Sequence, residues 1–365
     1  MNGEKYMPYK NKLQSYLDIF ALSLSLKENN SWLLEDHKQN YSLLFSLYIK
    51  MIEKDQQEFF ARSADKKQII HSLEKSKNFY TFTCDKQLLH TLEQLNTNDP
   101  SDFVLLPLFY LIGQCTDVEH VSGILIYKEN ETYKAILVDK EACISKAQIN
   151  VVTIPSTNLT SLCSILFSNI ECPNIKEPYS VLYGILEQSA SSEIIQLPYQ
   201  MHPQKEGNCV VKEIEATLKV ALFHCRHNLF ASQNLKKIKW NERPNSTIKM
   251  HNLLLSVIKE EYQGPAAPFD LLSKFFKLRK RKNTRPYPLT LQEKKMINQK
   301  MQNKMNKYPE IQQILEGKNV YKFSNGTVNN RIDFFEKIAG AKEKSNFSRK
   351  QCQDRNKFTI SKYMR

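Results

Sequence analysis

The spacing of apolar residues changes along the chain and divides it into regions. From about Tyr9 to Leu95, apolar residues recur at helical spacing, for example over 13–20 and 43–52. This spacing places apolar side chains on one face of a helix, so several amphipathic helices are predicted. The turn-forming cluster at 96–101 ends the pattern and predicts a domain boundary.

Short β-type runs follow this boundary. Apolar and β-branched residues fill 103–111, 121–127 and 133–138, and a polar stretch at 128–132 separates the last two runs. The pattern predicts one strand followed by a β-hairpin.

The later part of the sequence predicts a mixture of elements. We expect loops and helices over 151–188, a short strand over 194–199, and a helix that begins at Val210. Helices followed by strands are typical of the α+β class. The expected regions are a helical N-terminal region at 1–98, a strand-rich domain at 99–270 and a C-terminal tail at 271–365.

The net charge of +14 is distributed unevenly. Residues 271–365 contain 24 Lys and Arg against 7 Asp and Glu, a net of +17, so residues 1–270 carry −3. The tail, densest at Lys277–Lys282, therefore predicts contact with an anionic membrane or another polyanion. No motif of a nucleic-acid-binding fold accompanies it, so sequence-specific nucleic-acid binding is not expected.

Composition and cysteine usage indicate a protein that works in a reducing compartment. Hydrophobic residues make up 41% and charged residues 25% of the chain, which are globular values. The N-terminal segment lacks the pattern of a secretory signal, and the longest apolar run, Phe103–Ile112, is too short to span a bilayer. The eight cysteines include no CxxC pair, so neither a metal site nor a disulfide framework is predicted. We expect a cytoplasmic location.

Cys209 is the candidate nucleophile. It follows Gly207-Asn208, which allows a tight turn, and it directly precedes the predicted helix. A thiol reacts at neutral pH as the thiolate, which both a helix N-terminus and a nearby imidazole stabilise.

His120 and Asp139 are the candidate base and its orienting acid. His120 directly precedes the first hairpin strand, and Asp139 directly follows the second. Antiparallel pairing brings these two ends together, so the carboxylate can hold the imidazole in one tautomer. Gln204, with Gln200 as the alternative, is the candidate donor to the oxyanion formed in acyl transfer.

These residues resemble a known family of enzymes. FVLLPL followed by EHVSGILIYKENETYKAILVDK resembles the strand and His-hairpin-acid block of the CE clan of cysteine proteases, and IIQLPYQMHPQKEGNCVVKEIEATL resembles its Gln-Cys-helix block. The clan includes the Ulp/sentrin-specific proteases, adenain and the YopJ-like bacterial effectors. The resemblance covers about 101–230. Val121 and Val210 stand where many members have Trp and Gly.

The resemblance implies a papain-like, Ulp-like core with a small central mixed sheet flanked by helices. By it, Cys209 would be the nucleophile, His120 the general base, Asp139 its orienter and Gln204 the oxyanion donor. The implied activity is that of a thiol protease or isopeptidase acting, without a cofactor, on ubiquitin or a ubiquitin-like modifier.

Two alternative functions remain open. A YopJ-like acetyltransferase would use the same nucleophile with acetyl-CoA and inositol hexakisphosphate, and a non-enzymatic protein would bind anionic lipid or nucleic acid through the tail. The Lys/Asn/Ile-rich composition and the missing Sec-type signal fit a bacterial effector delivered into a host cell.

Overall fold

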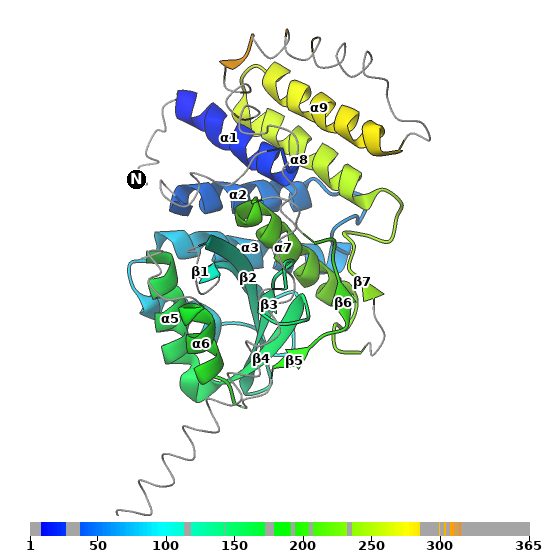
Figure 1. Ribbon diagram of the computed structural model, residues 1–365. Coiled ribbons are helices and arrows are strands. Elements are labelled where there is room, and N and C mark those ends of the chain that lie inside the picture. The colour runs from blue at the N-terminus through cyan, green and yellow to red at the C-terminus, as the bar shows by residue number, and fades with distance from the viewer. Residues whose placement is uncertain are drawn as a thin grey trace, which may run out of the picture.

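The computed structural model shows helices packed around an antiparallel sheet (Figure 1). It describes residues 9–26, 37–112, 118–142, 144–171, 179–190, 194–203, 207–231 and 236–284, with isolated positions between 299 and 314. The prediction for Gln204 and most predictions for the C-terminal tail lie outside the described residues.

The predicted N-terminal helices are confirmed. They are α1 (Tyr9–Ser23), α2 (His37–Glu53), α3 (Ser63–Asn78), the 3₁₀ turn η1 (Phe79–Thr81) and α4 (Asp85–Glu93). Their apolar faces join the same buried core as the sheet. The helical region therefore forms part of the body that carries the sheet, and the division at residue 98 stays a prediction.

Five strands form the main sheet in the order β1-β2-β3-β4-β5, and every neighbouring pair is antiparallel. The strands are β1 (Phe103–Ile112), β2 (Val118–Glu129), β3 (Thr132–Val138), β4 (Ile149–Pro155) and β5 (Ile195–Gln196). The expectation of a mixed main sheet is wrong, because each connection in this sheet reverses the strand direction. Among the described residues, parallel pairing joins β6 (Tyr199–Gln200) to β7 (Lys236–Lys237).

The predicted strand and hairpin are confirmed as β1, β2 and β3, whereas β4 was predicted as part of a loop and helix region. β4 is short and buried along most of its length, and such an apolar run has no alternation that distinguishes a strand from a helix. The single strand predicted at 194–199 is divided between β5 and β6.

The outer edge of β1 is covered by polar side chains of neighbouring helices. The N–H groups of Phe103 and Leu105 donate to the hydroxyls of Ser72 and Ser76 on α3, at 3.0 and 2.9 Å. Pro107 has no N–H to satisfy. A proline is tolerated on an edge strand for this reason, and the covered edge cannot pair with another chain.

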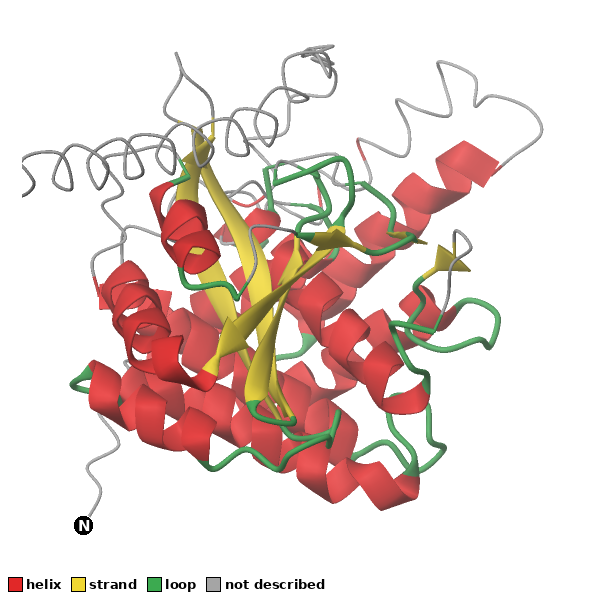
Figure 2. Cartoon of the chain, turned by 90° about the horizontal axis from the view of Figure 1, so that it is seen from below, coloured by secondary structure: helices red, strands yellow, loops and turns green. Residues whose placement is uncertain are grey.

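The remaining described helices pack on the sheet or on the N-terminal helices (Figure 2). They are α5 (Leu159–Glu171) after the 3₁₀ turn η2 (Ser156–Asn158), α6 (Ser180–Glu187), α7 (Cys209–Arg226), α8 (Ser246–Tyr262) and α9 (Ala267–Thr284). α7 packs against β2, and its first part also meets α1, so it lies between the sheet and the N-terminal helices (Figure 1).

The predicted tail begins within the packed structure. Leu271 and Leu272 of α9 are buried, as are Ile311 and Ile314 farther along. None of the described helices is long and apolar enough to cross a membrane.

Candidate active site

The β2–β3 hairpin brings His120 and Asp139 together. β2 extends beyond its last pairing with β3, Gly123 opposite Val138, so His120 projects past the end of the shorter strand that Asp139 follows. His120 Nε2 lies 3.2 Å from Asp139 Oδ1, and both side chains are buried.

The Asp139 carboxylate is held by several donors besides the imidazole. Oδ1 accepts the N–H of Glu141 at 2.9 Å, and Oδ2 accepts the N–H of Ile144 at 3.2 Å and the Tyr110 hydroxyl at 3.3 Å. Donors of this kind favour the charged form of a carboxyl group and restrict its orientation. Asp139 is therefore fixed as an ionised acceptor for His120.

Cys209 is the first residue of α7 and lies close enough to His120 to raise the pKa of the imidazole. The amide groups of the first helical turn lack intrahelical partners, and the helix dipole favours negative charge at this end. Asn208, the preceding residue, donates through Nδ2 to Leu22 O at 3.1 Å and to Ser25 Oγ at 2.9 Å. The end of α1 thus anchors the residue that precedes the thiol.

A glycine in β2 allows α7 to come close enough to complete this arrangement. A Cβ atom at Gly123 would lie 1.8 Å from Thr217 Oγ1 and 2.7 Å from Thr217 Cβ. No side chain fits there without a change in helix position. Since Thr217 and Cys209 belong to the same helix, this close approach helps set the distance from Cys209 to His120.

The surroundings of His120 favour its protonated form. Burial opposes the charge, but the carboxylate of Asp139 and the contact with Cys209 outweigh it and hold the pKa of His120 well above its ordinary value. These contacts favour a positive charge on the imidazole beside the Cys209 side chain.

Other buried cysteines have surroundings that suppress reactivity. Burial raises the pKa of both Cys163 and Cys225 to about 12, and nearby carboxylates contribute. The Cys225 thiol also donates to Pro100 O at 3.2 Å. These thiols remain protonated at neutral pH.

The oxyanion donor is the part of the predicted site that the structure does not place. Gln204 lies outside the described residues, and Gln200 is an exposed residue of β6 whose carbonyl accepts the N–H of Ile238 at 3.1 Å. The backbone amide of Cys209, at the start of α7, is a suitable donor to a developing oxyanion.

Three contributors to the site were not predicted. Tyr110 bonds to Asp139, Asn208 anchors the Cys209 turn, and Glu213 accepts the N–H of Lys140 at 2.9 Å. Tyr110 lies opposite His120 in the β1–β2 register, so the strand pairing would have indicated it. The partners of Asn208 are 183 and 186 residues away in the sequence, and no local pattern signals them.

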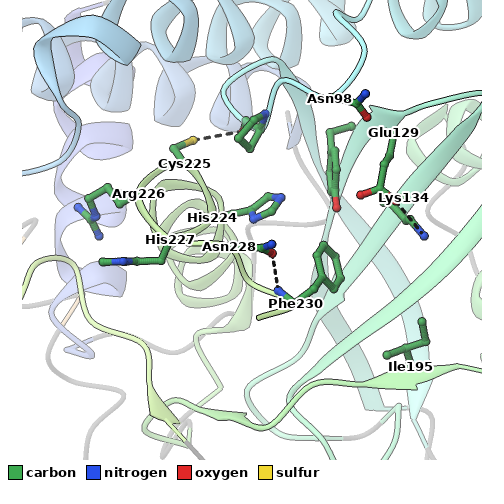
Figure 3. Close-up of a pocket in the computed structure, with 12 residues that line it drawn as sticks. Asn98, Glu129, Lys134, Ile195, His224, Cys225, Arg226, His227, Asn228 and Phe230 are labelled. Atoms are coloured by element: carbon green, nitrogen blue, oxygen red, sulfur yellow. Dashed lines mark hydrogen bonds and ion pairs between the residues drawn. The ribbon is translucent and has the colours of Figure 1, made fainter. Parts of the chain in front are cut away.

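A cavity of about 560 Å³ lies at the far end of α7 (Figure 3). His224 and Cys225 of this helix line it together with Phe230 of the following loop, and none of His120, Asp139 and Cys209 lines it. Fifteen residues of α-helix separate His224 from Cys209, about 22 Å along the axis. Burial lowers the pKa of His224, which favours the neutral imidazole. Burial raises the pKa of the neighbouring Cys225, which makes its thiol unreactive.

The described residues contain no group of three or more His, Cys, Asp or Glu side chains that could hold a metal ion.

Comparison with known proteins returned no relative. Neither a protein-family model, a curated protein nor a solved structure matches the chain.

Proposed function

We propose that the protein is a cysteine-dependent hydrolase with Cys209 as nucleophile, His120 as proton carrier and Asp139 as orienting acid. One observation carries the proposal. A cysteine at a helix N-terminus lies beside an imidazole whose Nε2 lies 3.2 Å from a buried carboxylate. This is the geometry that thiol acyl transfer requires.

The reaction proceeds in two steps. The Cys209 thiolate attacks the scissile carbonyl carbon, and the oxyanion accepts the backbone N–H of Cys209. As the carbon–nitrogen bond breaks, His120 gives its proton to the leaving amine, and a thioester remains. Neutral His120 then takes a proton from water, whose oxygen attacks the thioester, and the acid product leaves with the Cys209 thiolate and the imidazolium restored.

The proposed substrate class comes from the sequence resemblance. The order of strand, His-bearing hairpin, acidic residue and Cys-bearing helix is similar to that of the CE clan, whose Ulp-like members cleave ubiquitin-like modifiers. The β2–β3 hairpin and the packing of α7 against β2 support this order of elements, although the main sheet is antiparallel and not mixed as the resemblance implies. We propose an isopeptide or peptide bond after a ubiquitin-like C-terminus as the target, within a host cell if the chain is a delivered effector.

Electrophilic probes test the proposal directly. Ubiquitin, SUMO and NEDD8 with C-terminal electrophiles should label the wild-type protein, and labelling should be lost in Cys209→Ala but retained in the matched control Cys225→Ala. Failure of all three probes, together with stable acetylation of Cys209 by acetyl-CoA, would replace the hydrolase by the acetyltransferase. Equal labelling of Cys209→Ala would exclude this nucleophile.

A further inference from the structure

The side chain of Glu213 is a buried carboxyl group that the proposed reaction does not use. Glu213 follows Cys209 by one turn of α7, so the two residues lie on the same face of the helix. It is 0% exposed. Glu213 Oε2 accepts the backbone N–H of Lys140 at 2.9 Å, and Oε1 has no hydrogen-bond partner among the described residues.

The contact with Lys140 links α7 to the turn that carries Asp139. Lys140 directly follows Asp139, and its carbonyl accepts from Gln148 Nε2 at 2.6 Å. The same turn supplies the Glu141 N–H that bonds to Asp139. The Lys140 N–H is therefore the point at which this turn is bonded to the helix of the nucleophile.

Several charged groups surround Glu213. Asp139 and Lys140 approach from the turn after β3, His120 from β2, and Lys219 lies farther along α7. Burial raises the pKa of Glu213 to about 8, and the Asp139 carboxylate adds to this effect, while His120 and Lys140 oppose it. Burial also lowers the pKa of Lys140, and lowers that of Lys219 to about 8.

We propose that Glu213 is a positioning residue which, as a neutral carboxylic acid, holds the Lys140 turn and so presents Asp139 to His120. The inference rests on the proposed function of the triad. A neutral acid keeps the acceptor for the Lys140 N–H without placing a second negative charge beside Asp139. Ionisation would put a charge on a carboxylate whose Oε1 is buried and has no hydrogen-bond partner among the described residues.

Two substitutions separate the acceptor from the charge. Glu213→Gln keeps an acceptor oxygen and is neutral at every pH, whereas Glu213→Leu has similar volume and leaves the Lys140 N–H unpaired. At pH 7, Cys209 in Glu213→Gln should react with iodoacetamide at close to the wild-type rate. Glu213→Leu should react about tenfold more slowly, since an unsatisfied buried donor destabilises the turn. Cys84→Ala, present in all variants, removes a partly exposed cysteine that would add background alkylation.

Two further measurements test the protonation state of Glu213 and its contact with the Lys140 N–H. Infrared difference spectra of wild type minus Glu213→Gln should contain the carbonyl band of a neutral carboxylic acid at pH 7 and lose it well above pH 8. Hydrogen exchange should show a Lys140 amide that is protected in wild type and Glu213→Gln and exposed in Glu213→Leu.

The inference is overturned if Glu213→Gln reacts as slowly as Glu213→Leu, if Glu213→Leu matches wild type, or if the neutral-acid band is missing at pH 7. The variant His120→Ala distinguishes failure of the Glu213 inference from failure of the proposed function. If His120→Ala leaves the alkylation rate of Cys209 unchanged, the triad is not the source of reactivity, and the infrared and exchange results still decide the role of Glu213.

Discussion

Replacement of Gly123 by alanine should displace α7 from the sheet. The new Cβ would lie 1.8, 2.7 and 3.0 Å from three side-chain atoms of Thr217, well inside van der Waals contact. The strand and helix must therefore separate by roughly 1 Å or more, which for an overpacked core costs about 1–3 kcal/mol of unfolding free energy. Cys209 moves with the helix, and a 1 Å misplacement of a reacting group can lower the rate about 100-fold.

Urea unfolding and the iodoacetamide rate of Cys209 measure the two effects. Gly184→Ala is the matched control. Its Cβ would be tight only against the flexible Ile165 Cδ1, at 3.3 Å, and in ordinary contact with two further Ile165 atoms at 3.5 and 3.6 Å, so we expect a change of no more than about 1 kcal/mol. Thr217→Gly added to Gly123→Ala removes all three close atoms and should restore most of the alkylation rate. Two outcomes would refute this account of the Cys209–His120 distance. One is a Gly123→Ala variant with the stability and alkylation rate of the wild type. The other is a folded Gly123→Ala/Thr217→Gly variant that does not recover the alkylation rate.

Three further predictions concern charge. Because the pKa of Glu213 is raised, to about 8, the folded state holds a proton that the unfolded state loses, so stability falls as pH rises toward 8. Urea titrations should show the advantage of Glu213→Gln over wild type growing by at most about 1.4 kcal/mol per pH unit between about pH 5 and 8 and then levelling; a flat difference, as expected for the exposed control Glu187→Gln, would contradict it. Asp139→Asn removes the carboxylate that raises the pKa of His120, so kcat on a probe substrate should fall about 10³–10⁴-fold. The curve of Cys209 alkylation rate against pH should move to higher pH. An unchanged curve would count against the imidazolium–thiolate pair. Removal of residues 315–365 spares the buried Ile311 and Ile314, so it should keep turnover but weaken binding to anionic vesicles. Binding of the wild-type protein to these vesicles should decline steeply as the salt concentration rises. Salt-independent binding would exclude an electrostatic contact between the tail and the vesicles.

Local patterns in the sequence were sufficient for the N-terminal helices, the hairpin and α7. Each depends on periodicity or turn residues within a short window, as in the polar stretch at 128–132 between two apolar runs. The proximity of His120 and Asp139 was predictable for the same reason, because a hairpin joins neighbouring segments. β4 was missed because an uninterrupted buried run carries no periodicity, and pairing with β3 decides its structure.

The meeting of Cys209 with His120 depends on tertiary packing. The two residues are far apart in sequence. The local pattern indicated only that Cys209 directly precedes a helix, and the pairing with His120 was implied by the family resemblance. The approach of α7 to β2 depends on the absence of a side chain at Gly123, and the turn before Cys209 is held by the end of α1. Neither contact leaves a local signal, because each side chain is compatible with many surroundings until the helices dock.

The sequence by itself determined which residue types were available for thiol chemistry and which elements carry them. Only the tertiary structure decided their electrostatic state. The environment of Glu213 illustrates the difference, since a glutamate in a helix reads as a charged surface residue. Its burial against Lys140 and Asp139 raises the pKa of the Glu213 carboxyl group, because desolvation and a neighbouring carboxylate both oppose its charge.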